Sequence, residues 1–99
     1  MSGTTCLSSG LLISGGQITA GRGTLNALTV ITDGATASTI TLYDNATAAT
    51  GRVLAKITIG GAAGSGFQSW NLAVRHLNGI YADFTGGGAA AGYIVYYGA

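Results

Sequence analysis

The sequence predicts an all-β fold, namely an antiparallel β-sandwich, jelly-roll-like, with about seven to eight strands. Three observations lead to this prediction. Apolar and polar residues alternate with a period of two along most of the chain, turn residues separate these runs, and no run of a dozen residues has an apolar period of 3.6. A parallel sheet would require crossover helices, and the sequence provides no segment for them.

The expected strands follow one another along almost the whole chain. The first two are short and weakly patterned, and the others alternate clearly; they span residues 11–14, 17–20, 24–32, 39–43, 52–59, 67–74, 79–85 and 92–98. We expect two parts, an N-terminal arm or extended segment over residues 1–20 and a single β-sandwich domain over residues 21–99.

The alternation also predicts which side chains face the core. In 52–59, we expect Val53 and the residues that alternate with it to lie on one face, with Leu54 and Lys56 on the opposite, polar face. A lysine there is typical of an edge strand. Trp70 forms an apolar row with Leu72 and Val74, and Phe67 and Phe84 are the other aromatic residues expected in the core.

Turn residues mark the strand ends. The dipeptides Asp33-Gly34 and Asn78-Gly79 favour turns that need positive φ, and the second, between two apolar runs, predicts a β-hairpin. Two glycine-rich segments, 60–66 and 86–92, read as connecting loops. The segment 44–52 reads as a polar hairpin tip, which we expect to be a turn that also offers Asp44 and Asn45 as exposed contacts.

Composition excludes several classes of function. Charged residues make up only 7% of the 99 residues, the net charge is +1, and the four basic residues are scattered, so a nucleic-acid interface is not expected. No apolar run approaches the length of a membrane span, and the N-terminus lacks the basic region of a signal peptide. Cys6 is the one cysteine, so neither an internal disulfide nor a cysteine metal site is expected.

The residues that could support catalysis are few. The three carboxylates are Asp33, Asp44 and Asp83, and the first two lie in turn contexts, where aspartate caps its own backbone. His76, the one histidine, ends a strand and is expected at the surface or an interface. No nucleophile, phosphate-binding or dinucleotide-binding motif is present. We therefore expect no catalytic residues, no metal site and no cofactor.

The tyrosine-rich last strand predicts an interface instead. Its tyrosines fall on both faces, so at least one face should reach the surface, and tyrosine is enriched at protein interfaces. The short apolar run near the N-terminus could add an edge strand to a neighbouring subunit. The residues expected at interfaces are Leu11, Leu12, Ile13, Tyr93, Tyr96 and Tyr97.

Two segments carry a resemblance to a known group of proteins. "GTLNALTVITDGATASTITLYDNATAATGRVLAKITI" and "NGIYADFTGGGAAAGYIVYY" resemble small all-β virion structural proteins of tailed bacteriophages, of the capsid decoration (cement) type. The resemblance covers roughly residues 21–98 and leaves out the first 20. It is a pattern over the whole domain and transfers no catalytic residue.

The resemblance implies a non-enzymatic role. A protein of this type binds the major capsid protein lattice and stabilises the head, as a homotrimer, on the capsid surface of a virion that is assembled in the host cytoplasm. Neither nucleic acid nor a membrane is implied as a partner. The alternative is a phage tail, fibre or host-adhesion module that binds glycans.

Overall fold

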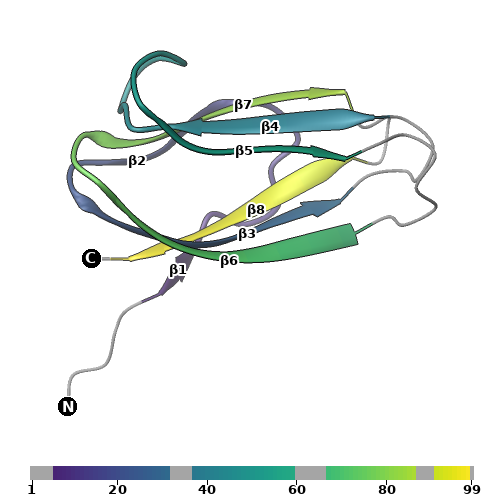
Figure 1. Ribbon diagram of the computed structural model, residues 1–99, viewed down its shortest axis with the longest axis horizontal. Helices are drawn as coiled ribbons and strands as arrows, with labels where there is room; N and C mark the ends of the chain where they lie inside the picture. The colour runs from purple at the N-terminus through teal and green to yellow at the C-terminus, as the bar shows by residue number, and fades with distance from the viewer. Residues whose placement is uncertain (1–5, 32–36, 60–66, 87–90, 99) are drawn as a thin grey trace.

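The structure is a computed structural model that describes residues 6–31, 37–59, 67–86 and 91–98, although not the side chains of residues 67 and 68. The described residues form two four-stranded antiparallel sheets (Figure 1). In chain order the strands are β1 (Leu7–Ser8), β2 (Gly16–Ala20), β3 (Gly23–Ile31), β4 (Ser38–Tyr43), β5 (Val53–Ile59), β6 (Phe67–His76), β7 (Gly79–Gly86) and β8 (Gly92–Gly98).

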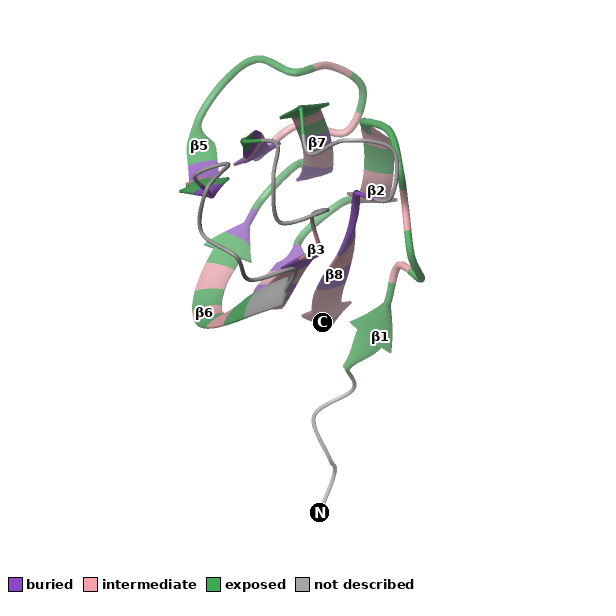
Figure 2. Cartoon of the chain, turned by 90° about the vertical axis from the view of Figure 1, so that its right-hand side faces the viewer, coloured by how far each residue is buried: buried purple, intermediate pink, exposed green. Residues whose placement is uncertain are grey.

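The strand order is that of a jelly roll. One sheet has the order β1-β8-β3-β6 and the other β2-β7-β4-β5, and Figure 2 shows them end-on as two layers. Strands that follow each other along the chain lie in opposite sheets, except β4 and β5, which pair with each other. This order confirms the predicted antiparallel sandwich of jelly-roll type.

The core lies between the sheets, where the apolar rows of both inner faces meet. Because successive side chains of a strand point to opposite faces, the longer strands contribute mainly alternate residues to this layer. The buried apolar residues are Leu25, Leu28, Val30, Ile40, Leu42, Leu54, Ile59, Ile80, Ala82, Tyr93 and Val95. The rings of Phe84 and Tyr93 pack across the layer with their centroids 5.1 Å apart.

β-bulges or register shifts break the simple alternation in four strand pairings. Leu25 and Leu28 are both fully buried although they are three residues apart, because the register of β3 shifts against both of its neighbours between Leu25 and Ala27. At the same level of β6, Ala73 has a φ of 88°, the one positive φ among the described non-glycine residues. Further register shifts occur between β2 and β7 and between β4 and β5.

The bulge in β5 overturns the expected face of two residues. Val53 was expected inside and Leu54 outside, but Val53 is 49% exposed and Leu54 is buried, since the register shifts where β5 begins. The rest of the strand follows the prediction, with Ile59 buried and Lys56 exposed on an edge strand.

The row of Trp70, Leu72 and Val74 packs against the core as expected, and all three side chains are half-buried. The reason is that β6 is an edge strand, so neighbouring strands cover it on one side only. Phe84 is likewise half-buried, and the side chain of Phe67 lies outside the described residues.

Residues 7–20, expected as an arm, instead supply two strands of the sandwich. β1 pairs with β8, β2 pairs with β7, and between them Leu12 forms a β-bridge with Tyr93 and packs against the core. Figure 2 shows the connection from β1 to β2 passing over the edge of the sandwich from one layer to the other. The expected boundary at residue 20 therefore does not separate two structural units.

The Asn78-Gly79 turn is present, but it does not close a hairpin. β6 and β7 on either side of it belong to different sheets, and Asn78 does not adopt the positive φ that the predicted turn type needs. The predicted turn at Asp33-Gly34 and the loop 60–66 lie outside the described residues, as does most of the loop 86–92.

Candidate functional site

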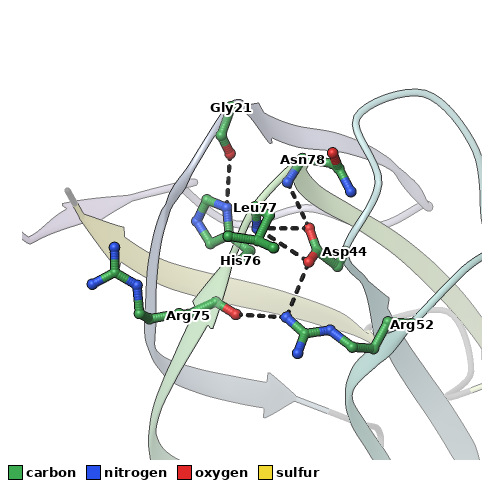
Figure 3. Close-up of polar contacts among 7 residues, drawn as sticks. All are labelled: Gly21, Asp44, Arg52, Arg75, His76, Leu77 and Asn78. Carbon is green, nitrogen blue, oxygen red and sulfur yellow. Dashed lines mark hydrogen bonds and ion pairs between the residues drawn. The ribbon is translucent and has the colours of Figure 1, made fainter.

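A polar cluster at one end of the sandwich centres on the side chain of Asp44, at the start of the loop from β4 to β5 (Figure 3). Its carboxylate is only 4% exposed. It accepts hydrogen bonds from the backbone N–H of Leu77, at 3.0 and 3.1 Å, and of Asn78, at 2.7 Å. One carboxylate thus satisfies two backbone donors of a turn more than 30 residues away, and the buried anion is fully hydrogen-bonded.

Arg52 completes this cluster from the other end of the same loop. Its guanidinium donates to Asp44 at 3.1 Å and to the backbone carbonyl oxygen of Arg75 at 3.0 Å. Arg52 itself is 61% exposed, so the ion pair is open to solvent on one side. Since β4 and β5 lie in one sheet and Arg75 lies in β6 of the other, the cluster ties the two sheets together at this end of the sandwich.

The environment of Asp44 keeps it ionised. Burial alone would raise the pKa of this carboxyl, but hydrogen bonds from the N–H groups of Asn78 and Leu77, the Arg52 side chain and the N–H of Gly79 outweigh burial and lower the pKa below 3.8. A carboxylate with this set of partners is a structural anion and has no free oxygen for proton transfer.

The hairpin tip is therefore a turn, and the expectation that Asp44 is an exposed contact is wrong. The neighbouring Asn45 also uses its side chain internally: its Oδ1 accepts from the N–H of Thr47 and Ala48, and its Nδ2 donates to the carbonyl oxygen of Thr50. The Asn45 side chain thus stabilises its own loop, and the Asp44 side chain holds the turn at Leu77 and Asn78.

His76 was expected at the surface but is 1% exposed. Its Nδ1 lies 2.9 Å from the carbonyl oxygen of Gly21, and its Nε2 has no hydrogen-bond partner among the described residues. The ring packs over Gly23, where an added Cβ would lie 3.0 Å from Nε2. His76 thus fills the space that the missing side chain of Gly23 leaves and joins β6 to the β2–β3 turn.

The structure does not assemble the candidate carboxylates into a pair. Asp44 is enclosed at the end of the sandwich, whereas Asp83 is exposed on the outer face of β7, and Asp33 lies outside the described residues. The described residues contain no group of three potential metal ligands. Cys6 is exposed and accepts a 3.5 Å hydrogen bond from Asn26.

The outer face of the β1-β8-β3-β6 sheet carries neutral side chains across its middle. Ala27 lies between Tyr96 and Asn71, and Thr29 lies between Ile94 and Ser69 in the next row. The Thr29 and Ser69 hydroxyls are hydrogen-bonded at 2.8 Å. We call this surface the neutral face; its residues are Ala27, Thr29, Ile31, Ser69, Asn71, Ile94 and Tyr96.

The outer face of the β2-β7-β4-β5 sheet has charges at its centre. Thr41 on β4 pairs with Lys56 of β5 on one side and with Asp83 of β7 on the other. In the next row Tyr43 lies between Val53 and Tyr81. We call this surface the charged face; its residues are Thr39, Thr41, Tyr43, Val53, Lys56, Thr58, Tyr81, Asp83 and Thr85.

The structure separates the three tyrosines that were expected at an interface. Tyr93 is fully buried and donates its hydroxyl hydrogen to the carbonyl oxygen of Ser14 at 2.7 Å, so it is a core residue with no surface to offer a partner. Burial, with a smaller contribution from Tyr81, raises the pKa of Tyr93 to about 12. Tyr97 packs partly against the core, and Tyr96 is half-buried on the neutral face.

The expected N-terminal contacts divide in the same way. Leu11 and Ile13 are 60% and 75% exposed, whereas Leu12 between them packs against the core. Leu11 and Ile13 remain available to a partner, and Leu12 does not.

The sequence did not reveal the arrangement of the charged face. Alternation puts Lys56 and Asp83 each on the polar side of its strand, but their common neighbour Thr41 follows only from the order β7-β4-β5. Alternation within a strand gives the face of a residue and not its cross-strand partner.

The described part of the chain contains no helix long and apolar enough to cross a membrane. No protein-family model matches the sequence, and comparison with curated proteins and with solved structures gave no significant match.

Proposed function

We propose that this chain is a non-enzymatic structural protein of a virion, a capsid decoration (cement) protein that binds the major capsid protein lattice and stabilises the head. The observation that carries this proposal is the neutral face, a surface over β8, β3 and β6 that includes Tyr96 and Ile94 and has no charged side chain among its members. Depletion of charge and enrichment of tyrosine are the compositional signals of an interface core.

A surface of this kind can bind a partner mainly through shape complementarity. Covering a charged side chain without a partner costs free energy, whereas hydroxyl and apolar groups can be covered at little cost if the hydroxyls find partners. With 7% charged residues, a lattice can cover much of the surface of the chain without burying unpaired charged side chains. Jelly rolls are also a common architecture of viral capsid domains.

The resemblance to virion proteins of tailed bacteriophages points in the same direction. It implies assembly on the capsid surface in the host cytoplasm, and it implies three copies per assembly. The neutral face supports a docking role by itself, whatever the number of copies.

Co-sedimentation with capsids that were assembled without this chain tests the proposal. We expect the wild-type chain to sediment with the capsids and Ile94→Lys to lose at least about tenfold in affinity, because an unpaired lysine would be covered in the contact. Ala49→Lys is the matched control, since it adds the same charge at an exposed position of the β4–β5 loop. Equal binding by wild type and Ile94→Lys would overturn this docking face, and no binding by the wild type would overturn the function.

Cys6 offers a second readout that does not depend on a mutation. As an exposed thiol hydrogen-bonded to Asn26 of β3, it lies beside the neutral face. A maleimide should therefore react with Cys6 more slowly in the capsid-bound chain than in the free chain. Unchanged reactivity with binding intact would show that a different surface makes the contact.

In the adhesion alternative, glycine- and tyrosine-bearing loops at one end of the sandwich would bind the glycan, and residues 32–36, 60–66 and 87–90 of such loops lie outside the described residues. A glycan array with the purified chain separates the two roles. We expect no saccharide to bind, and saturable binding to a defined glycan would favour an adhesion module over a capsid-binding protein.

A further inference from the structure

The residues of the charged face are arranged symmetrically on the two sides of β4. β4 runs along the middle, with β5 on one side and β7 on the other, and the three strands are aligned residue by residue through Thr39, Thr41 and Tyr43. At the level of Thr41 the flanking residues have opposite charges, Lys56 on β5 and Asp83 on β7, and both are exposed. Neighbouring strands are about 4.8 Å apart, so the two charges stand at similar distances on either side of β4.

A second copy of this chain fits this pattern. Consider a copy turned by 180° about an axis that runs parallel to β4 and lies just above its outer surface. The rotation preserves the level along β4 and exchanges the two sides, so that β5 of one copy faces β7 of the other. Lys56 of each copy then faces Asp83 of its partner copy, and the contact contains this ion pair twice.

The charges favour this two-fold axis over one that runs perpendicular to the strands. A two-fold axis perpendicular to the strands, through the same point, would preserve the sides and reverse the levels along β4. Lys56 would then face Lys56, and Asp83 would face Asp83, which is repulsive in both places. Packed sheets are about 10 Å apart, a gap that an extended lysine and an aspartate can bridge together.

The apolar residues of the face agree with the same rotation. In the row of Tyr43, the exposed Val53 of one copy faces Tyr81 of the other, and the two Tyr43 rings meet at the axis. In the row of Thr39, Thr58 faces Thr85. Thus all three rows become complementary, and the 49% exposed Val53 is covered by an aromatic ring.

We propose that two copies of this chain bind each other through the charged face, about a two-fold axis parallel to β4. The three overlapping strands β5, β4 and β7, with about six residues each, give a planar area of roughly 300 Å² per copy, which is smaller than a standard specific interface. A contact of this size is typical of weak, transient association, so we expect the dimer to form only at high protein concentration. The neutral face lies on the opposite side of the sandwich and stays free, so the pairing is independent of the proposed function.

Sedimentation equilibrium of the purified chain, up to about 1 mM, tests the pairing. The wild type should form dimers, and Lys56→Asp and Asp83→Lys should each raise the dissociation constant at least about tenfold, because each places like charges in contact twice. The double variant that carries both changes restores the pairs with reversed signs and should bind within about threefold of the wild type. Arg22→Asp is the control, because it makes the same charge change as Lys56→Asp at an exposed turn.

The outcomes that overturn the pairing are direct. These are a wild-type chain that stays monomeric at that concentration, a wild-type chain that forms only trimers, or a double variant as weak as the single ones. Circular dichroism of each variant shows whether it folds, and all substituted side chains are exposed. Capsid co-sedimentation of Lys56→Asp, measured at saturating concentration, should still show binding, so failure of the pairing and failure of the proposed function are separate results.

Discussion

The side chain of Asp44 holds the turn that connects β6 to β7. In a two-residue β-hairpin the turn is held by hydrogen bonds between the two strands that it joins. The turn from β6 to β7 lacks these, since its strands lie in different sheets, and Asp44 from a distant loop accepts the N–H hydrogens of Leu77 and Asn78 instead. The carbonyl oxygen of Asn78 in this turn also accepts a hydrogen bond from the N–H of Gly21.

Removing the charge of Asp44 should therefore be costly. We expect Asp44→Asn to lower the free energy of unfolding by about 2–4 kcal/mol, because an amide cannot accept all the hydrogen bonds that the carboxylate accepts, and Arg52 loses its partner. Asp83→Asn, at an exposed carboxylate, should change stability by less than about 0.5 kcal/mol. Urea unfolding at low protein concentration measures both, and equal effects would contradict the structural role of Asp44.

Asp44 also predicts how the stability of the fold changes at acidic pH. The folded pKa of Asp44 lies below its ordinary value of 3.8, so its contribution is fully present above that value and is lost as the pH falls below it toward the folded pKa. The stability difference between wild type and Asp44→Asn should hence be largest near neutral pH and shrink below about pH 4. A difference that is independent of pH from 7 to 2 would rule out this linkage.

Tyr93 predicts the opposite, alkaline dependence. Its pKa is raised from 10.0 to about 12 in the folded chain, so the unfolded chain loses this proton first, and stability falls as the pH rises from 10 toward 12. Tyr93→Phe should cost about 1 kcal/mol at neutral pH through the lost hydrogen bond to Ser14. It should also lose less stability than the wild type between pH 10 and 12, and thermal melts across this range compare the two chains.

At the scale of elements, alternation predicted the strands well and their irregularities poorly. The runs that begin near Thr24, Thr39 and Gly79 became strands with the expected residues inside, because period-two burial is a local property. The bulges are not local: Leu54 turns inward since β5 shifts its register against β4. Likewise Asn78-Gly79 marks a turn, but packing and the hydrogen bonds of Asp44 determine that β7 after the turn joins the other sheet.

The bulge in β6 leaves a strained residue that can be relieved. Ala73 has a φ of 88°, in a region where a Cβ is unfavourable and glycine is not. We expect Ala73→Gly to raise the free energy of unfolding by about 0.5–1 kcal/mol. Ala55→Gly is the control, because Ala55 lies in β5 without positive φ and glycine there should destabilise by a similar amount. Destabilisation by both substitutions would show that the bulge is not strained at Ala73.

At the scale of the whole molecule, the candidate surfaces depended on topology. Alternation along the chain does not place Lys56 and Asp83 on either side of Thr41, or Ile94 and Ser69 beside Thr29, since these neighbours are far apart in sequence. What the sequence did predict was the shortage of charge and the two-sided tyrosines of β8. One of these, Tyr93, lies with Val95 on the core-facing row of β8, and the N-terminal segment supplies the carbonyl oxygen that its buried hydroxyl needs.

The jelly-roll order also changes what truncation should do. As a removable arm, residues 2–15 could be deleted without loss of fold. In the structure this segment supplies β1, places Leu12 against the core and provides the carbonyl oxygen of Ser14 for the buried Tyr93 hydroxyl. Its removal would leave the edge of β8 unpaired and the Tyr93 hydroxyl without its hydrogen-bond acceptor.

We therefore expect deletion of residues 2–15 to lower the free energy of unfolding by about 3–5 kcal/mol, from lost apolar burial, lost backbone pairing and an unsatisfied hydroxyl together. A loss of that size is a large part of the total stability of a domain of 99 residues. Deletion of residues 2–5 is the control, since it removes none of the contacts named above. Thermal unfolding followed by circular dichroism compares the three chains, and a longer deletion that melts with the wild type would mean that β1 and Leu12 contribute little to the sandwich.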